Sequence, residues 1–120
     1  MPIECAFSYC EYLTSITIPD SVTDIERETF SYCSRLTSVI IPNSVKYIGR
    51  FAFKGCSMFG RIYYKGTKSG WNRISIASDY DGNTELMTAT RYYYSEGQPT
   101  DDGNYWYYVN GAPTVWTKEN

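Results

Sequence analysis

The sequence contains no histidine. Histidine is the usual general base at neutral pH and a common zinc ligand, so Ser-His-Asp and Cys-His catalysis and His-bearing zinc sites are excluded. Carboxylate pairs remain, but Glu26 with Glu28 and Asp101 with Asp102 are most simply solvated charges. The glycine-rich motifs that cradle phosphates are also missing. We therefore expect no enzymatic activity and no cofactor.

The charges are balanced, with eleven basic and thirteen acidic residues. No basic stripe of the kind that binds phosphate backbones is present, so nucleic acid is not an expected partner. No apolar run approaches the roughly 18 residues that span a bilayer. We therefore expect no membrane insertion in this segment, and Met1 begins no secretory leader.

The sequence contains only partial matches to the residue spacings of known metal-binding sites. Three of the four cysteines lie 23 positions apart, without the close pairs that structural zinc sites use. Asp79, Asp81 and Asn83 match the first ligands of a calcium loop, but Thr84 replaces the required glycine and Thr90 the final glutamate. We predict an ordinary loop there and no metal site.

A repeat organises the first half of the chain. The segment Leu13 to Val22 reads LTSITIPDSV and returns 23 positions later, at Leu36 to Val45, as LTSVIIPNSV. The same step relates Phe7, Phe30 and Phe53, then Cys10, Cys33 and Cys56, and also Ile25 and Ile48. A fixed period of this length is typical of a stacked solenoid.

The unit L-x-x-[IV]-x-I-P-[DN]-S-V-x-x-I, followed by an aromatic residue and a cysteine, resembles the BspA-like class of leucine-rich repeats over about residues 6–66. Such repeats occur on bacterial and some protist surface proteins. The resemblance implies a cell-surface or secreted location and a non-catalytic role in protein binding or adhesion. Because no leader is visible, we expect a fragment of a longer protein.

Each coil is expected to contain a strand, a turn, a second strand and a short helical turn. Pro19 and Pro42 should end the first strands, and ERETFSYCS and GRFAFKGCS have helical character. Alternation within the strands points every second side chain inward. The predicted core comprises Leu13, Ile16, Ile18, Phe30, Leu36, Val39, Ile41, Val45, Ile48 and Phe53. We predict a right-handed leucine-rich-repeat solenoid of about three coils, near residues 1–22, 23–45 and 46–66.

The third coil departs from the repeat. A step of 23 places Trp71 in the Ile48 column and Ile76 in the Phe53 column. Residues 67–120 are then expected to form a C-terminal capping region. Tyr92–Tyr94 and Tyr105–Val109 are strong strand formers near the turn dipeptides at 102–103 and 110–111, which predicts an aromatic β-hairpin that closes the open end of the stack. Similar aromatic tails occur at the C-termini of BspA-like proteins.

The cysteine column favours free thiols. Equivalent residues of successive coils point the same way, whereas a disulfide needs convergent Cβ atoms. We expect Cys10, Cys33 and Cys56 to be free and buried. Cys5 lies outside the column and either pairs locally with Cys10 or is a further free thiol.

Two surfaces are candidate binding sites. The first is the outward strand face, and its candidate residues are Ser15, Thr17, Ser38, Ile40, Arg61 and Tyr63. The second is the aromatic tail, where Tyr105, Trp106, Tyr108 and Trp116 offer rings that could stack on sugars. This tail somewhat resembles choline-binding and related cell-wall-binding repeats. The alternatives are that the rings serve only as core of the cap, and that the chain is a structural spacer.

The N-terminal end of the stack has no evident polar cover. Ile3, Ala6 and Phe7 leave apolar groups and a strand edge open. We predict self-association through this end, most simply with a second copy, unless residues 1–4 fold back over it. In a longer protein, preceding coils would occupy the same surface.

Overall fold

The computed structural model describes residues 2–3, 7–78 and 82–117. Its elements are β1 (Pro2–Ile3), β2 (Ser15–Thr17), β3 (Asp24–Ile25), β4 (Ser38–Pro42), β5 (Tyr47–Ile48), β6 (Arg61–Lys65), α1 (Lys68–Asn72), β7 (Ser75–Ile76), α2 (Thr84–Thr88), β8 (Thr90–Tyr94), β9 (Tyr105–Val109) and β10 (Ala112–Val115). Cys5, Asp79 and Asp81 lie outside the described residues.

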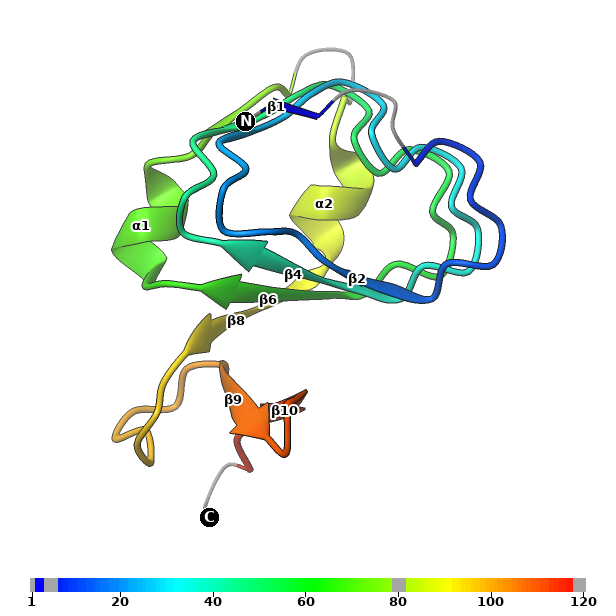
Figure 1. Ribbon diagram of the computed structural model, residues 1–120. Coiled ribbons are helices and arrows are strands. Elements are labelled where there is room, and N and C mark those ends of the chain that lie inside the picture. Colours follow the sequence, from blue (N-terminus) through cyan, green and yellow to red (C-terminus); the bar gives the residue numbers. More distant parts are fainter. Residues whose placement is uncertain (1, 4–6, 79–81, 118–120) are drawn as a thin grey trace.

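Two sheets form opposite walls of the coil (Figure 1). One wall contains β1, β3, β5 and β7 in parallel, and the other has the order β10-β9-β8-β6-β4-β2. Ser15 pairs with Ser38, and Ser38 pairs with Arg61, so neighbouring strands differ by the 23-residue repeat. The predicted repeat solenoid is confirmed, with Pro42 as the last residue of β4 instead of lying beyond it.

The core consists of columns of equivalent side chains. The rings of Phe7, Phe30 and Phe53 stack at centroid distances of 5.4 and 5.3 Å, and Phe59 continues the stack at 4.6 Å from Phe53. The predicted core residues are buried except two, which are partly exposed. These two are Leu13 and Ile16, because the first coil has packed neighbours on one side only.

The predicted helical turns are absent from the described parts of coils one to three. Residues with positive φ recur at equivalent positions: Tyr9, Tyr32 and Gly55 in one column, Glu28 and Phe51 in another. A left-handed residue interrupts a helix. The amide groups of these segments instead bond to the next coil, as Phe30 N donates to Ala52 O at 2.8 Å. The segment therefore contributes to cohesion between coils.

The third coil contains a five-residue excursion. Ile76 pairs with Ile48, 28 positions earlier, which exceeds the repeat by the five residues of α1. The prediction that Trp71 continues the Ile48 column is therefore wrong, and Ile76 does so instead of joining the Phe53 column. Trp71 packs edge-on against Tyr64, with ring centroids 5.4 Å apart. Strands β7 and β8 lie beyond residue 66 and still pair with the strands of the coils. The division into repeats and a capping region at residue 66 therefore stays a prediction.

The cysteine column agrees with the predicted free thiols. Cys10, Cys33 and Cys56 are unpaired, and Cys10 is only partly buried. Cys33 Sγ donates to Phe7 O and Cys56 Sγ donates to Phe30 O, each at 3.0 Å. Burial raises the pKa of the Cys56 thiol from 9.0 to about 12, so it stays protonated at neutral pH. The buried thiols of Cys33 and Cys56 are therefore inert packing groups.

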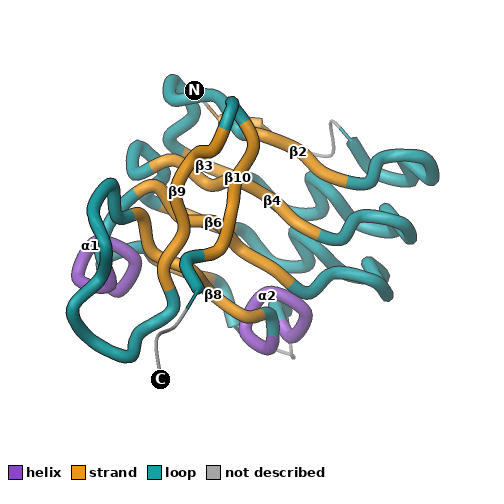
Figure 2. The backbone as a smooth tube through the Cα atoms, turned by 90° about the horizontal axis from the view of Figure 1, so that it is seen from below, coloured by secondary structure: helices purple, strands orange, loops and turns teal. Residues whose placement is uncertain are grey.

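The C-terminal hairpin differs from its prediction. Strand β8 pairs in parallel with β9, and the hairpin consists of β9 and β10 around Asn110 and Gly111, which have φ of 50° and 81°. Both values suit a two-residue turn of the hairpin type. The hairpin pairs with the β8 edge only at Tyr93 and Tyr94, and then lies across the outer face of the sheet (Figure 2). Its role as an end cap therefore stays a prediction.

Candidate functional site

The outer strand face has a covered part and an open part. Ile40 and Tyr63, both predicted ligand contacts, are only 6% and 5% exposed, because Trp106 of the hairpin packs on them. Trp106 itself is fully buried, and its Nε1 donates to Tyr64 O at 2.8 Å. While the hairpin is docked, Trp106 is closed to a ligand, and Ile40 and Tyr63 keep only small exposed areas.

The open part comprises β2 and the N-terminal ends of β4 and β6. Ser15, Thr17 and Arg61 are exposed and Ser38 is half-buried, with Ser15, Ser38 and Arg61 in one column. A shallow depression of about 390 Å³ adjoins the column and includes Met58, which is 58% exposed. Met58 is absent from the predicted contacts because it lies outside the strands.

Arg61 has a fixed orientation on this face. Its Nη1 donates to the Tyr63 hydroxyl at 3.1 Å, and its guanidinium lies 5.8 Å from the Tyr92 ring centroid. The hydrogen bond to Tyr63 raises the pKa of Arg61. A cation held by an aromatic ring keeps its position without an ion-pair partner. The face therefore presents one fixed positive charge among hydroxyl groups.

The predicted glycan-binding residues do not form one platform. Trp106 is buried, whereas Tyr108 is exposed and packs edge-on against it. Trp116 stacks on Tyr107 at a centroid distance of 3.9 Å, and its Nε1 donates to Ser95 O at 2.8 Å. Tyr105 is half-buried and lines a separate cavity at the end of the stack. Among these four residues only Trp106 and Tyr108 pack on each other, while Trp116 packs on Tyr107.

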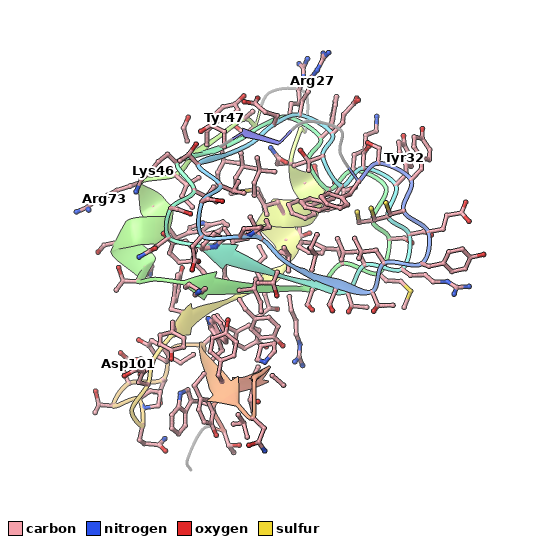
Figure 3. The ribbon with its side chains drawn as sticks, viewed as in Figure 1. Arg27, Tyr32, Lys46, Tyr47, Arg73 and Asp101 are labelled. Carbon is pink, nitrogen blue, oxygen red and sulfur yellow. The ribbon has the colours of Figure 1, made fainter. Side chains whose placement is uncertain are left out.

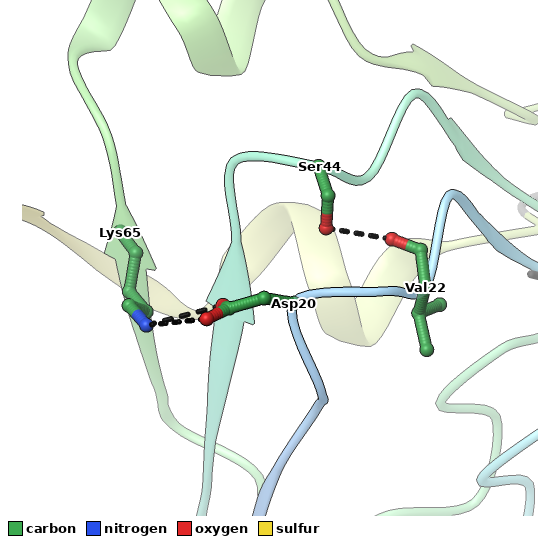
Figure 4. A network of polar contacts seen from close by, with 4 residues as sticks. All are labelled: Asp20, Val22, Ser44 and Lys65. Carbon is green, nitrogen blue, oxygen red and sulfur yellow. Dashed lines mark hydrogen bonds and ion pairs between the residues drawn. The ribbon is translucent and has the colours of Figure 1, made fainter.

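Polar contacts between coils lie at or just beyond the C-terminal ends of β2, β4 and β6. Lys65 Nζ forms an ion pair with Asp20 at 3.1 Å and so joins the third coil to the first (Figure 4). Ser44 Oγ donates to Val22 O at 2.7 Å between adjacent coils. Asp20 is well exposed, so this ion pair contributes little to stability.

Residues 2–3, 7–78 and 82–117 contain no cluster of three His, Cys, Asp or Glu side chains suited to a metal ion. Within the same residues, no helix has the length and apolar character needed to cross a membrane.

Comparison with known proteins agrees with this geometry. The family model for the BspA type leucine rich repeat region (6 copies) matches residues 3–75. The crystal structure of a leucine rich cell surface protein from Faecalibacterium prausnitzii A2-165 is similar, with 40% sequence identity and a TM-score of 0.58. The match covers 60% of this chain and 19% of that protein, and no curated protein matches significantly. The chain belongs to the BspA-type leucine-rich repeat family.

Proposed function

We propose that this chain is a non-catalytic interaction module on a cell surface, and that it binds a protein through the open part of its strand face. Family membership and the similarity to a surface protein support the location and the general role. Leucine-rich solenoids offer continuous strand faces for binding. The proposed contacts are Ser15, Thr17, Ser38 and Arg61, while Ile40 and Tyr63 act as the floor under the hairpin.

The observation that carries this proposal is the fixed guanidinium of Arg61 beside the exposed Met58. Arginine and methionine are enriched in protein interfaces. Holding Arg61 in place before binding reduces the entropy that its side chain loses in a complex. Ser15 and Ser38 add hydroxyl donors and acceptors along the same column.

The test uses two charge reversals on opposite walls. Arg61→Glu changes the open strand face, while Lys46→Glu is the matched control beside β5 on the other wall (Figure 3). Immobilised wild type and variants are titrated with a panel of purified extracellular-matrix and bacterial surface proteins. We expect Arg61→Glu to weaken binding of a panel member at least about tenfold and Lys46→Glu to leave it unchanged.

Several outcomes would contradict this proposal. Binding that survives Arg61→Glu would exclude the strand face, and equal losses in both variants would indicate a non-specific charge effect. Failure to bind any panel member would favour the spacer alternative. Retention on a glycan array instead of the protein panel would favour a carbohydrate-binding role.

We also infer a right-handed stack of about three coils. Parallel pairing of successive strands supports it, since connections between parallel strands are right-handed in nearly all proteins. The aromatic hairpin would then shield the outer wall and part of the β8 edge.

The N-terminal end of the stack is a proposed contact surface for a second copy or for preceding coils. Tyr12 is 80% exposed, Leu13 and Ile16 are half-buried, and β2 is the last strand of its sheet among the described residues. Light scattering at micromolar concentration should reveal a dimer that Ile16→Glu dissociates. A monodisperse wild-type monomer would rule out the second copy.

A further inference from the structure

A cavity of about 750 Å³ lies at the C-terminal end of the stack, beyond β8. It lies among the start of α1, the end of α2, strand β8 and the segment 101–105 (Figure 1). Its volume is within the usual range for small-ligand pockets. It is separate from the strand face, so the outcome of either proposal leaves the other intact.

The core columns that contain Ile62 and Tyr64 end at this cavity, and their last members carry polar groups. Arg91 pairs with Ile62 and Tyr93 with Tyr64, so Arg91 and Tyr93 occupy positions that are apolar or aromatic in the preceding coils. Arg91 Nε donates to the Tyr93 hydroxyl at 3.1 Å, and the guanidinium lies 4.9 Å from the Trp71 ring centroid. Packing requires no charge there, because an aliphatic residue would also cover Trp71.

The uncompensated charge of the cavity is positive. Across the described ranges, no carboxylate forms an ion pair with Arg91 or with the exposed Lys68 at the start of α1. Asp101 lines the same cavity, where it accepts from Tyr105 Oη at 2.9 Å and from Gly103 N at 2.8 Å, and its single negative charge offsets only one of the two positive charges. The two cations therefore remain available to an anionic ligand.

The rings of Tyr93 and Tyr105 add aromatic surface to the same cavity. The faces of aromatic rings carry partial negative charge and attract the polarised C–H groups of a pyranose. Guanidinium groups bind carboxylates strongly through charge-assisted hydrogen bonds. The free lone pairs of the Asp101 carboxylate can accept from sugar hydroxyls.

We propose that this cavity binds an acidic saccharide, a pyranose that carries a carboxylate. Arg91 and Lys68 hold the carboxylate, Tyr93 and Tyr105 contact the sugar ring, and Asp101 accepts from its hydroxyl groups. The positive charge distinguishes acidic from neutral sugars, because a neutral sugar leaves both cations unpaired.

The test is isothermal titration calorimetry with trigalacturonic acid and its methyl ester, in which a methyl group on each carboxyl removes the negative charge. We expect the acid to bind and the ester to bind at least about tenfold more weakly. Lys68→Gln should weaken binding of the acid about fivefold. Arg73→Gln is the matched control, because Arg73 is exposed at the end of α1 and projects outward from the protein (Figure 3).

Arg91→Met distinguishes a role of Arg91 in binding the ligand from a role in covering the Trp71 ring. Methionine keeps apolar cover over Trp71 and removes the charge, so the melting temperature should be retained while binding of the acid is lost. Absence of binding at 10 mM would overturn the proposal, as would equal affinities for acid and ester or equal effects of Lys68→Gln and Arg73→Gln. Stronger binding of an acidic peptide than of the saccharide would overturn it as well.

Discussion

Trp106→Ala is expected to release the C-terminal hairpin from the sheet, with a loss of about 3–5 kcal/mol in the free energy of unfolding. Trp106 is fully buried, lies 5.4 Å from Tyr63 and 5.2 Å from Tyr94 between ring centroids, and donates to Tyr64 O. Its removal leaves a large cavity and deletes the hydrogen bond to Tyr64 O. The coils should persist, because their phenylalanine stack lies away from the hairpin.

Denaturant unfolding measures the lost stability. Hydrogen exchange at the amide of Ser95, which donates to Trp106 O at 3.0 Å, measures undocking. Trp106→Phe keeps an aromatic ring but lacks the hydrogen bond, so it should fall between wild type and alanine. Val109→Ala changes an exposed residue of the same strand and should cost less than about 1 kcal/mol. Unchanged stability together with continued protection of the Ser95 amide would show that Trp106 does not hold the hairpin.

Phe30→Ala should have a comparable effect on the solenoid itself, about 3–5 kcal/mol. Phe30 is fully buried between the parallel rings of Phe7 and Phe53, so the substitution removes two stacking contacts and opens a cavity between coils. The surrounding columns are fixed by backbone pairing on both walls and cannot collapse into the gap. Calorimetric unfolding measures the change in melting temperature.

Tyr12→Ala is the control for this substitution. It also removes one aromatic ring, but Tyr12 is 80% exposed, so the expected loss is below about 1 kcal/mol. Similar melting temperatures for Phe30→Ala and Tyr12→Ala would mean that the phenylalanine stack does not stabilise the solenoid.

The repeat made the walls and core of the coils predictable from the sequence. Residues 23 positions apart take equivalent places in successive coils, so the apolar character shared along a column assigned Val39, Ile41 and Phe53 to the core. The left-handed turns were missed because Tyr9, Tyr32 and Glu28 are residue types that rarely adopt positive φ. Gly55, in the same column as Tyr9 and Tyr32, was the one residue whose type favours a positive φ.

Two features depended on contacts that periodicity does not encode. Strand β8 pairs with β6 at a step of 29 residues, from Arg61 to Thr90, and the shared Tyr-Tyr pairs of RIYYK and TRYYY were the available signal. The sequence signal for docking of the hairpin was that Ile40 and Tyr63, two large apolar side chains, point outward from the strands. Their cover comes from Trp106, more than 40 residues after Tyr63 in the chain, so no local pattern identifies it.

The excursion at α1 determines how such a protein can change in length. A new coil can pair on both walls only if it contributes 23 residues to the columns. Any additional residues must lie outside the two walls, as the five residues of α1 do. Recombination between equivalent positions of two repeats adds or removes one complete coil and keeps every column in alignment. Such exchanges can therefore alter the length of the strand face in equal steps, because each added coil brings core residues that already fit the columns.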